Sequence, residues 1–137
     1  MASIQGLRTA IGTNLASVSG LRVSPTITST VNPPFATVYP TSNPVEFHLA
    51  SNNASSMFHF EVMIVVGRAD ERSAQNLLDE FCSTTGSRSI LLAIELDRSL
   101  GGLAQDCVAR QVSSYGSTAI NEIEYLAATF QVDVIAT

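Results

Sequence analysis

Residues 58–66 alternate so regularly that they define one strand and its orientation. By the period-two rule, one face carries only apolar side chains: Phe58, Phe60, Val62, Ile64 and Val66. We expect that face to lie in the core. The opposite face is also half apolar, and it carries Met57, His59, Glu61, Met63 and Val65. Because a strand that is apolar on both faces is usually covered on both, another subunit is the second cover we expect in a domain this small.

The chain has 137 residues, which is the size of one domain, and we expect a single domain over residues 1–137. Apolar residues make up 45% and charged residues 14%, which favours a packed core over disorder. The apolar runs all fall short of the roughly 18 residues that a membrane-spanning helix needs. The beginning of the chain also lacks the basic and apolar segments of a secretory signal. We therefore expect neither a membrane protein nor a secreted one.

The charge balance argues against a nucleic-acid-binding protein. All seven basic residues are arginines scattered along the chain, and twelve acidic residues give a net charge of -5. A surface that releases counterions from a phosphate backbone is difficult to build from this set. An acidic protein can still line a passage through which DNA slides without binding.

The segments before residue 58 predict one helix, two strands and an arm. A stripe of apolar residues predicts a helix over residues 4–18, with Ser3 as its amino-terminal cap and Gly20 as its end. Residues 21–31 predict a strand that is broken or at an edge because of Pro25. Residues 35–39 predict a short strand that ends at Pro40.

The segments after residue 66 predict two helices and two strands. Asp70-Glu71 opens a helix with the stripe Ala74, Leu77, Leu78 and Phe81, and a second short helix carries Ile90, Leu91, Ile94 and Leu96. Gly101-Gly102 indicates a tight turn. Residues 104–115 and 120–135 predict antiparallel strands that turn around Gly116, with a bulge near Tyr125. The predicted fold class is α+β: a largely antiparallel sheet with helices packed on one face, plus an extended arm or hairpin.

Residues 41–56 predict that arm. Apolar and polar side chains alternate from Val45 to Leu49, and a polar run follows at 51–56. A connection this long in a small domain is usually functional or disordered. We expect a mobile arm that reaches a neighbouring subunit. Arg68 and Arg72 lie one helical turn apart and could pair with acidic residues of a neighbour. Together with the arm and the second face of the central strand, they give these candidate protein-interface residues: Val45, Phe47, His48, Leu49, Asn52, Asn53, Met57, His59, Met63, Arg68 and Arg72.

The sequence contains no catalytic, cofactor-binding or metal-binding motif. Cys82 and Cys107 have neither C-x-x-C spacing nor polar surroundings, so we expect both in the core of a protein from a reducing compartment. His48 and His59 lack a third ligand at metal-site spacing. The acidic residues Asp70, Glu71, Asp79 and Glu80 suit the positive end and the solvated side of a helix better than acid–base chemistry.

The order and spacing of several segments resemble the tail terminator proteins of long-tailed, non-contractile bacteriophages, especially the form found in phages of actinobacteria. The opening helix runs into Gly20-Leu21-Arg22, and Asn32-Pro33-Pro34 precedes a short strand. The central strand leads into Arg68-Ala69-Asp70-Glu71-Arg72-Ser73-Ala74-Gln75. Residues 93–102 resemble the most recognisable segment of the family, and residues 125–134 resemble its last strand. The resemblance covers nearly the whole chain, although the arm at 41–56 matches in position and not in residues.

This resemblance implies a structural protein of the virion and no enzyme. Such proteins form a ring, expected here to be a homo-hexamer, on the head-proximal end of the tail tube. The ring stops polymerisation of the tube protein and presents a docking surface to the head-completion (neck) proteins, and phage DNA passes through its centre. Assembly would take place in the cytoplasm of the host bacterium, without cofactors. Two alternatives remain open: another neck or tail component, such as a head–tail joining protein or a tube subunit, or a small cytosolic enzyme that uses Cys82 or the histidines.

Overall fold

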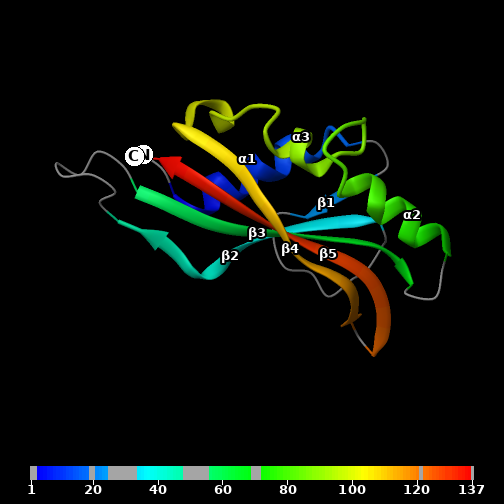
Figure 1. Cartoon of the computed structure of the whole chain (residues 1–137). Helices are drawn as coiled ribbons and strands as arrows, with labels where there is room; N and C mark the ends of the chain where they lie inside the picture. The colour runs from blue at the N-terminus through cyan, green and yellow to red at the C-terminus, as the bar shows by residue number, and fades with distance from the viewer. Residues whose placement is uncertain are drawn as a thin grey trace.

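Helices cover one face of a five-stranded sheet in the computed structural model of this protein (Figure 1). The structure describes residues 3–18, 21–24, 34–47, 56–68, 72–120 and 122–136. The strand order is β1-β2-β3-β5-β4, in which β1 runs parallel to β2 and the other neighbours are antiparallel. The predicted α+β class, with a largely antiparallel sheet, is confirmed.

The elements follow the chain in the order helix, three strands, two helices and two strands. Their bounds are α1 (Ile4–Leu15), β1 (Arg22–Ser24), β2 (Phe35–Glu46), β3 (Ser56–Arg68), α2 (Arg72–Phe81), α3 (Ile90–Ile94), the 3₁₀ turn η1 (Leu100–Gly102), β4 (Asp106–Ile120) and β5 (Ile123–Ala136). The predicted helix cap is correct, because the Gly6 N–H donates to Ser3 Oγ at 3.0 Å. The helix ends at Leu15 instead of Val18, although Val18 is still buried.

The core lies between the helices and one face of the sheet. All five residues that the alternation placed on the inner face of β3 are at most 8% exposed, and Phe60, Val62 and Ile64 are at most 1% exposed. They join one cluster with side chains from all three helices. The predicted inner face of β3 is therefore confirmed, and so is the stripe of α2, of which Ala74, Leu78 and Phe81 are buried.

The other face of the sheet is partly covered by the chain itself. Val65 is fully buried there, in a small separate cluster with Phe35 and Ala127. Met63 and Tyr125 pack against this cluster. The expectation that a second subunit covers this face is therefore wrong for Val65. Met57, His59, Glu61 and Met63 are only half-buried.

The β2 strand is longer than the sequence predicted. It continues through Pro40 to Glu46, and after a register shift Val45 and Glu46 lie opposite Phe58 and Met57 of β3. A proline lacks only its own N–H, so an edge strand can accommodate it. The first part of the predicted arm, residues 41–46, is thus a strand. Phe47 follows it and is 71% exposed. The arm residues His48, Leu49, Asn52 and Asn53 lie outside the described residues, as does most of the strand predicted at 21–31.

The last hairpin turns later than predicted. β4 runs through Gly116 to Ile120 and β5 begins at Ile123, after Glu122, which has a φ of 67°. The bulge expected near Tyr125 lies on the partner strand, between Val65 and Gly67 of β3. Further register shifts occur in β4, between Ala109 and Gln111 and between Val112 and Ser114. The far end of this hairpin bends away from the helices (Figure 1).

Candidate functional site

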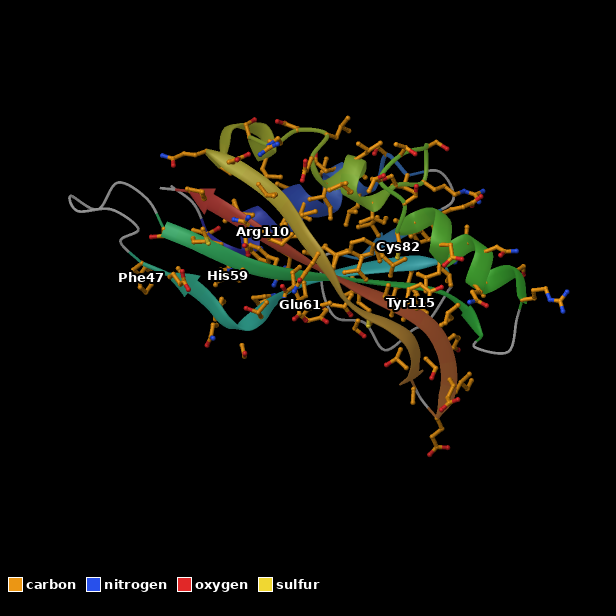
Figure 2. The ribbon with its side chains drawn as sticks, viewed as in Figure 1. Phe47, His59, Glu61, Cys82, Arg110 and Tyr115 are labelled. Carbon is orange, nitrogen blue, oxygen red and sulfur yellow. The ribbon has the colours of Figure 1, made fainter. Side chains whose placement is uncertain are left out.

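A row of polar side chains crosses the helix-free face of the sheet, and Figure 2 labels two of them, His59 and Arg110. His59 Nδ1 lies 2.7 Å from Asp133 Oδ1, and His59 Nε2 lies 3.6 Å from Glu46 Oε1. Arg110 Nε–H donates to Asp133 Oδ2 at 2.9 Å. The row takes one residue from each of β2, β3, β5 and β4, which are consecutive in the sheet. Its clearest role is to connect four strands, since partly exposed pairs of this kind each contribute about 0–1 kcal/mol.

A shallow polar hollow of about 390 Å³ lies beside this row, between the end of β2 and the middle of the sheet. Glu46, Glu61 and Asp133 contribute carboxylates to its wall, and His59 contributes its ring. Tyr39 is hydrogen-bonded to Glu61, and burial together with this contact raises the pKa of Tyr39 to about 12. Within the described residues, no group of three or more His, Cys, Asp or Glu side chains is placed to hold a metal ion.

The two thiols are held in their protonated form. Burial raises the pKa of Cys107 to about 12 and that of Cys82 to about 11. Cys107 is fully buried in the core, as predicted, whereas Cys82 is only partly buried against it. Figure 2 shows Cys82 at the end of α2, far from His59 on β3. The structure therefore does not bring Cys82 and His59 together as a cysteine–histidine pair.

The remaining candidates from the sequence are spread over the molecule. Asp79 accepts a hydrogen bond from Tyr115 Oη at 2.6 Å, and Glu80 accepts one from Arg88 at 2.6 Å. Arg72 is exposed at the start of α2. Arg68 lies at the end of β3, and its side chain is outside the described part of the chain, as are Asp70 and Glu71. The predicted interface residues that the structure describes thus lie on several surfaces and do not form one site. Val45 and Phe47 lie at the end of β2, and Arg72 lies on α2. Met57, His59 and Met63 lie on the helix-free face of the sheet.

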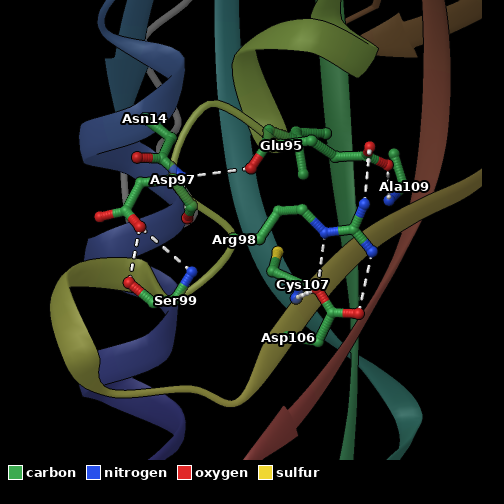
Figure 3. Close-up of polar contacts among 9 residues, drawn as sticks. Asn14, Glu95, Asp97, Arg98, Ser99, Asp106, Cys107 and Ala109 are labelled. Atoms are coloured by element: carbon green, nitrogen blue, oxygen red, sulfur yellow. Dashed lines mark hydrogen bonds and ion pairs between the residues drawn. The ribbon is translucent and has the colours of Figure 1, made fainter.

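Residues 93–102 form a clamp between helices and sheet (Figure 3). The Asn14 side chain reaches from α1 and donates to the carbonyls of Ile94 and Asp97, both at 3.1 Å. The Asp97 carboxylate accepts from the Ser99 hydroxyl at 2.6 Å and from the Gly101 N–H at 3.0 Å. These bonds hold the pKa of Asp97 below its usual value. Gly101 has a φ of 70°, as the predicted tight turn requires.

The same clamp reaches the edge strand β4. Arg98 donates two hydrogen bonds to the Asp106 carboxylate, at 2.6 and 2.9 Å, which lowers the pKa of Asp106. Glu95 Oε1 lies 3.7 Å from Arg98 Nη1, and Glu95 Oε2 accepts a hydrogen bond from the backbone N–H of Ala109 at 3.1 Å. Sequence reasoning identified the turn but missed the roles of Asn14, Glu95 and Asp106. Each of the three is a single polar residue: Asn14 lies in a helix, Glu95 in a turn and Asp106 at the start of a strand. No sequence motif connects any of them with the residue that it contacts.

Several large apolar side chains remain exposed in the described chain. Leu92, Leu96 and Leu103 are 49%, 66% and 42% exposed on the side of α3 and η1. The sequence had placed Leu96 in a helical stripe, but α3 ends at Ile94. Phe47 is exposed at the end of β2, and Val112, Tyr115 and Ile123 are exposed on the β4–β5 hairpin. Single exposed apolar residues are common, but groups of them indicate contact surfaces.

Comparison with known proteins adds no family to this description. No protein-family model matches the chain, and no curated protein matches it. Among the described helices, none is long and apolar enough to cross a membrane. Any inference about function therefore rests on the residues and their contacts.

Proposed function

We propose that this chain is a structural subunit of a bacteriophage tail, a tail terminator that assembles into a ring on the head-proximal end of the tail tube. The resemblance of its segments to that family motivates the proposal. The observation that carries it is the presence of exposed apolar side chains on separate elements, two of which can serve as the two surfaces of a ring subunit. Leu92, Leu96 and Leu103 lie on the helical layer, whereas Phe47 lies beyond the end of β2.

Two separate contact surfaces are what a head-to-tail ring needs. In a cyclic assembly each subunit uses one surface toward the neighbour on one side and a different surface toward the neighbour on the other side. The leucines and Phe47 belong to different elements, so they can serve as two such surfaces. A homo-hexamer with the tail tube protein below it and the head-completion proteins above it is the assembly we propose.

The charge of the chain fits a passage for DNA. Twelve acids against seven arginines leave a net charge of -5, and in the described part of the chain Arg88, Arg98 and Arg110 are paired with acidic side chains. A lumen lined by such an acidic protein does not attract the phosphate backbone. DNA would therefore move through it without sequence-specific binding.

Electron microscopy of the phage with a stop codon in the gene for this chain tests the proposal. A tail terminator predicts tails of irregular, excessive length that do not join heads, and restoration of normal tails when the intact chain is supplied. Tails of normal length that fail to join heads would indicate a head–tail joining protein instead. Complete absence of tails would indicate a tube subunit.

Light scattering of the purified chain gives the matched biochemical test. We expect an oligomer larger than a dimer at high concentration, and Leu96→Ser should weaken it without lowering the melting temperature, because Leu96 is 66% exposed. Ser73→Ala, at an exposed position of α2, serves as the control that leaves assembly unchanged. Tails that reach normal length with a chain that never oligomerises would contradict the ring.

A further inference from the structure

The β4 strand forms one edge of the sheet, and its two halves differ in how that edge is protected. Among the described strands β4 pairs only with β5, so no described strand covers its other side. Unpaired strand edges are templates for pairing with other chains, and proteins usually protect them with charges, prolines or bulges. In the first half of β4 these protections are present: Glu95 accepts the Ala109 N–H, Arg110 carries a charge, and register shifts fall at Arg110 and Ser113.

The second half of β4 lacks these protections. Residues 114–119 pair with β5 in unbroken register, from Ser114 opposite Thr129 to Ala119 opposite Glu124. The six residues contain no charge and no proline. Most are exposed, including Tyr115 at 46%. Within the described part of the chain, no group outside β5 hydrogen-bonds to the backbone of this segment.

The opposite edge of the sheet does not offer an equivalent partner. β1 covers β2 only from Phe35 to Thr37, so the outer side of β2 has no described neighbour beyond that point. Pro40 and Pro44 lie on this stretch, and neither has an N–H to donate. Pairing with another strand is therefore disfavoured along β2 and permitted along residues 114–119.

The open segment is also held in place. Tyr115 Oη donates to Asp79 of α2 at 2.6 Å, which attaches the hairpin to the helical layer (Figure 2). A strand that is already extended and anchored loses less conformational freedom when it pairs with another strand.

We propose that residues 114–119 pair with the same segment of a second copy of this chain. Two identical segments that meet about a two-fold axis run antiparallel and form a closed, isologous contact. The absence of charge matters because two copies, each with a net charge of -5, repel least along a neutral segment. The pair joins two five-stranded sheets into one continuous sheet.

This pairing does not rest on the proposed function. A two-fold contact closes on itself, whereas a ring needs head-to-tail contacts. The pair is therefore a form of the free chain that has to separate before a subunit enters a ring.

A single lysine on the edge tests the pairing. In Ser117→Lys the two copies bring like charges together beside the two-fold axis, and we expect the dissociation constant of the dimer to rise about tenfold or more. Ser73→Lys adds the same charge on α2 and should leave the dimer unchanged. Both variants should melt like the parent, because both serines are exposed. Analytical ultracentrifugation over a range of concentrations measures the constants.

Hydrogen exchange and cysteine crosslinking identify the contact. Amides of residues 114–119 should exchange more slowly at high protein concentration than at low concentration, and those of the outer side of β2 should not change. In a Cys82→Ser background, Ser117→Cys, which lies beside the two-fold axis, should give a disulfide-linked dimer on oxidation, and Ser73→Cys should not. A chain that stays monomeric at every concentration overturns the pairing. So does a dimer that leaves the exchange of residues 114–119 unchanged, and neither result affects the tail-length test of the proposed function.

Discussion

The two halves of β4 show how one strand can serve two different purposes. Its first half lies over the core, with Cys107 fully buried, and the clamp around Arg98 and Glu95 closes its edge. Its second half leaves the helical layer with β5 and carries exposed side chains on both faces. A protected edge is typical of a part that has to fold alone, whereas an open edge is typical of a part that meets a partner.

This comparison divides stability and function between two regions. The region under the helices, which we call the body, contains nearly all of the fully buried side chains. The far hairpin, residues 112–120 and 122–124, contributes exposed residues and an anchoring contact from Tyr115 to Asp79. We therefore expect substitutions in the body to change the free energy of unfolding and substitutions in the far hairpin to change association.

The largest effect is expected from Phe60→Ala in the middle of β3. Phe60 is 1% exposed, and removing it leaves a cavity in the main core, so we expect a loss of about 3–5 kcal/mol. Since small domains are stable by only about 5–15 kcal/mol, the variant should be marginal or insoluble. Urea unfolding measures the loss, and Met57→Ala on the half-buried opposite face is the control with a smaller effect. A variant that melts like the parent would show that the body does not depend on this face.

A smaller loss is expected from Asn14→Ala in α1. The Asn14 amide is the side chain that satisfies the carbonyls of Ile94 and Asp97 across a buried contact. Its removal leaves both without this donor, at a cost of about 1–3 kcal/mol. Thermal unfolding of Asn14→Ala beside Thr13→Ala, an exposed neighbour, checks the prediction. Equal melting temperatures for the two variants would contradict a structural role for the clamp.

Acid should open the protected half of β4 before it unfolds the core. The pKa of Asp106 is lowered mainly by its hydrogen bonds to Arg98, and that of Asp97 mainly by its bond to Ser99. A carboxyl whose pKa is lower in the folded state stabilises the fold above its unfolded pKa, about 3.9 for aspartate, and loses this contribution as the pH falls through the folded value. Stability should therefore be insensitive to these groups from pH 5 to 8 and fall below about pH 4.

Arg98→Met separates the contribution of the clamp from that of other carboxyls. Without the guanidinium the Asp106 pKa should move back toward its usual value, so the stability of the variant should depend less on pH in the acid range. Hydrogen exchange of the Ala109 amide follows the edge itself, because Glu95 accepts this N–H beside Arg98. An acid profile that is identical in the parent and the variant would show that the clamp is not the group that titrates.

The body was largely predictable from the sequence because periodicity reports burial. The alternation of residues 58–66 identified the inner face of β3, and the apolar stripe of α2 identified its buried side. The cap at Ser3 followed from the preference of serine for that position. In each case a local pattern determines the outcome, since a strand or helix with one apolar face has only one favourable orientation.

The two edges of the sheet were not predictable in the same way. Pro40 predicts the end of a strand, but β2 continues because an edge position does not need that N–H. Gly116 predicts a turn, but it lies inside β4, where glycine adopts its φ of 155° without the strain of a side chain. A proline or glycine in the sequence indicates where strand pairing is weakened. Whether the strand ends there depends on the neighbouring strands. The contacts of Glu95 and Asn14 depend on residues up to 83 positions away, so no local pattern indicates them.

The smallest effect on the free energy of unfolding is expected at the tip of the far hairpin. Two isoleucine-to-alanine substitutions, one in the body and one at this tip, allow the two effects to be compared. Ile64 is fully buried in β3, whereas Ile123 is 39% exposed at the start of β5. Ile64→Ala should lower the free energy of unfolding by about 2–5 kcal/mol. Ile123→Ala should change it by less than about 1 kcal/mol, since part of the side chain is already in water and the tip is paired on one side only. Urea unfolding of both variants gives the ratio directly. If Ile123→Ala destabilises the chain as much as Ile64→Ala does, the far hairpin belongs to the folding core. The position of its exposed edge would then follow from the requirements of folding and would not indicate a binding surface.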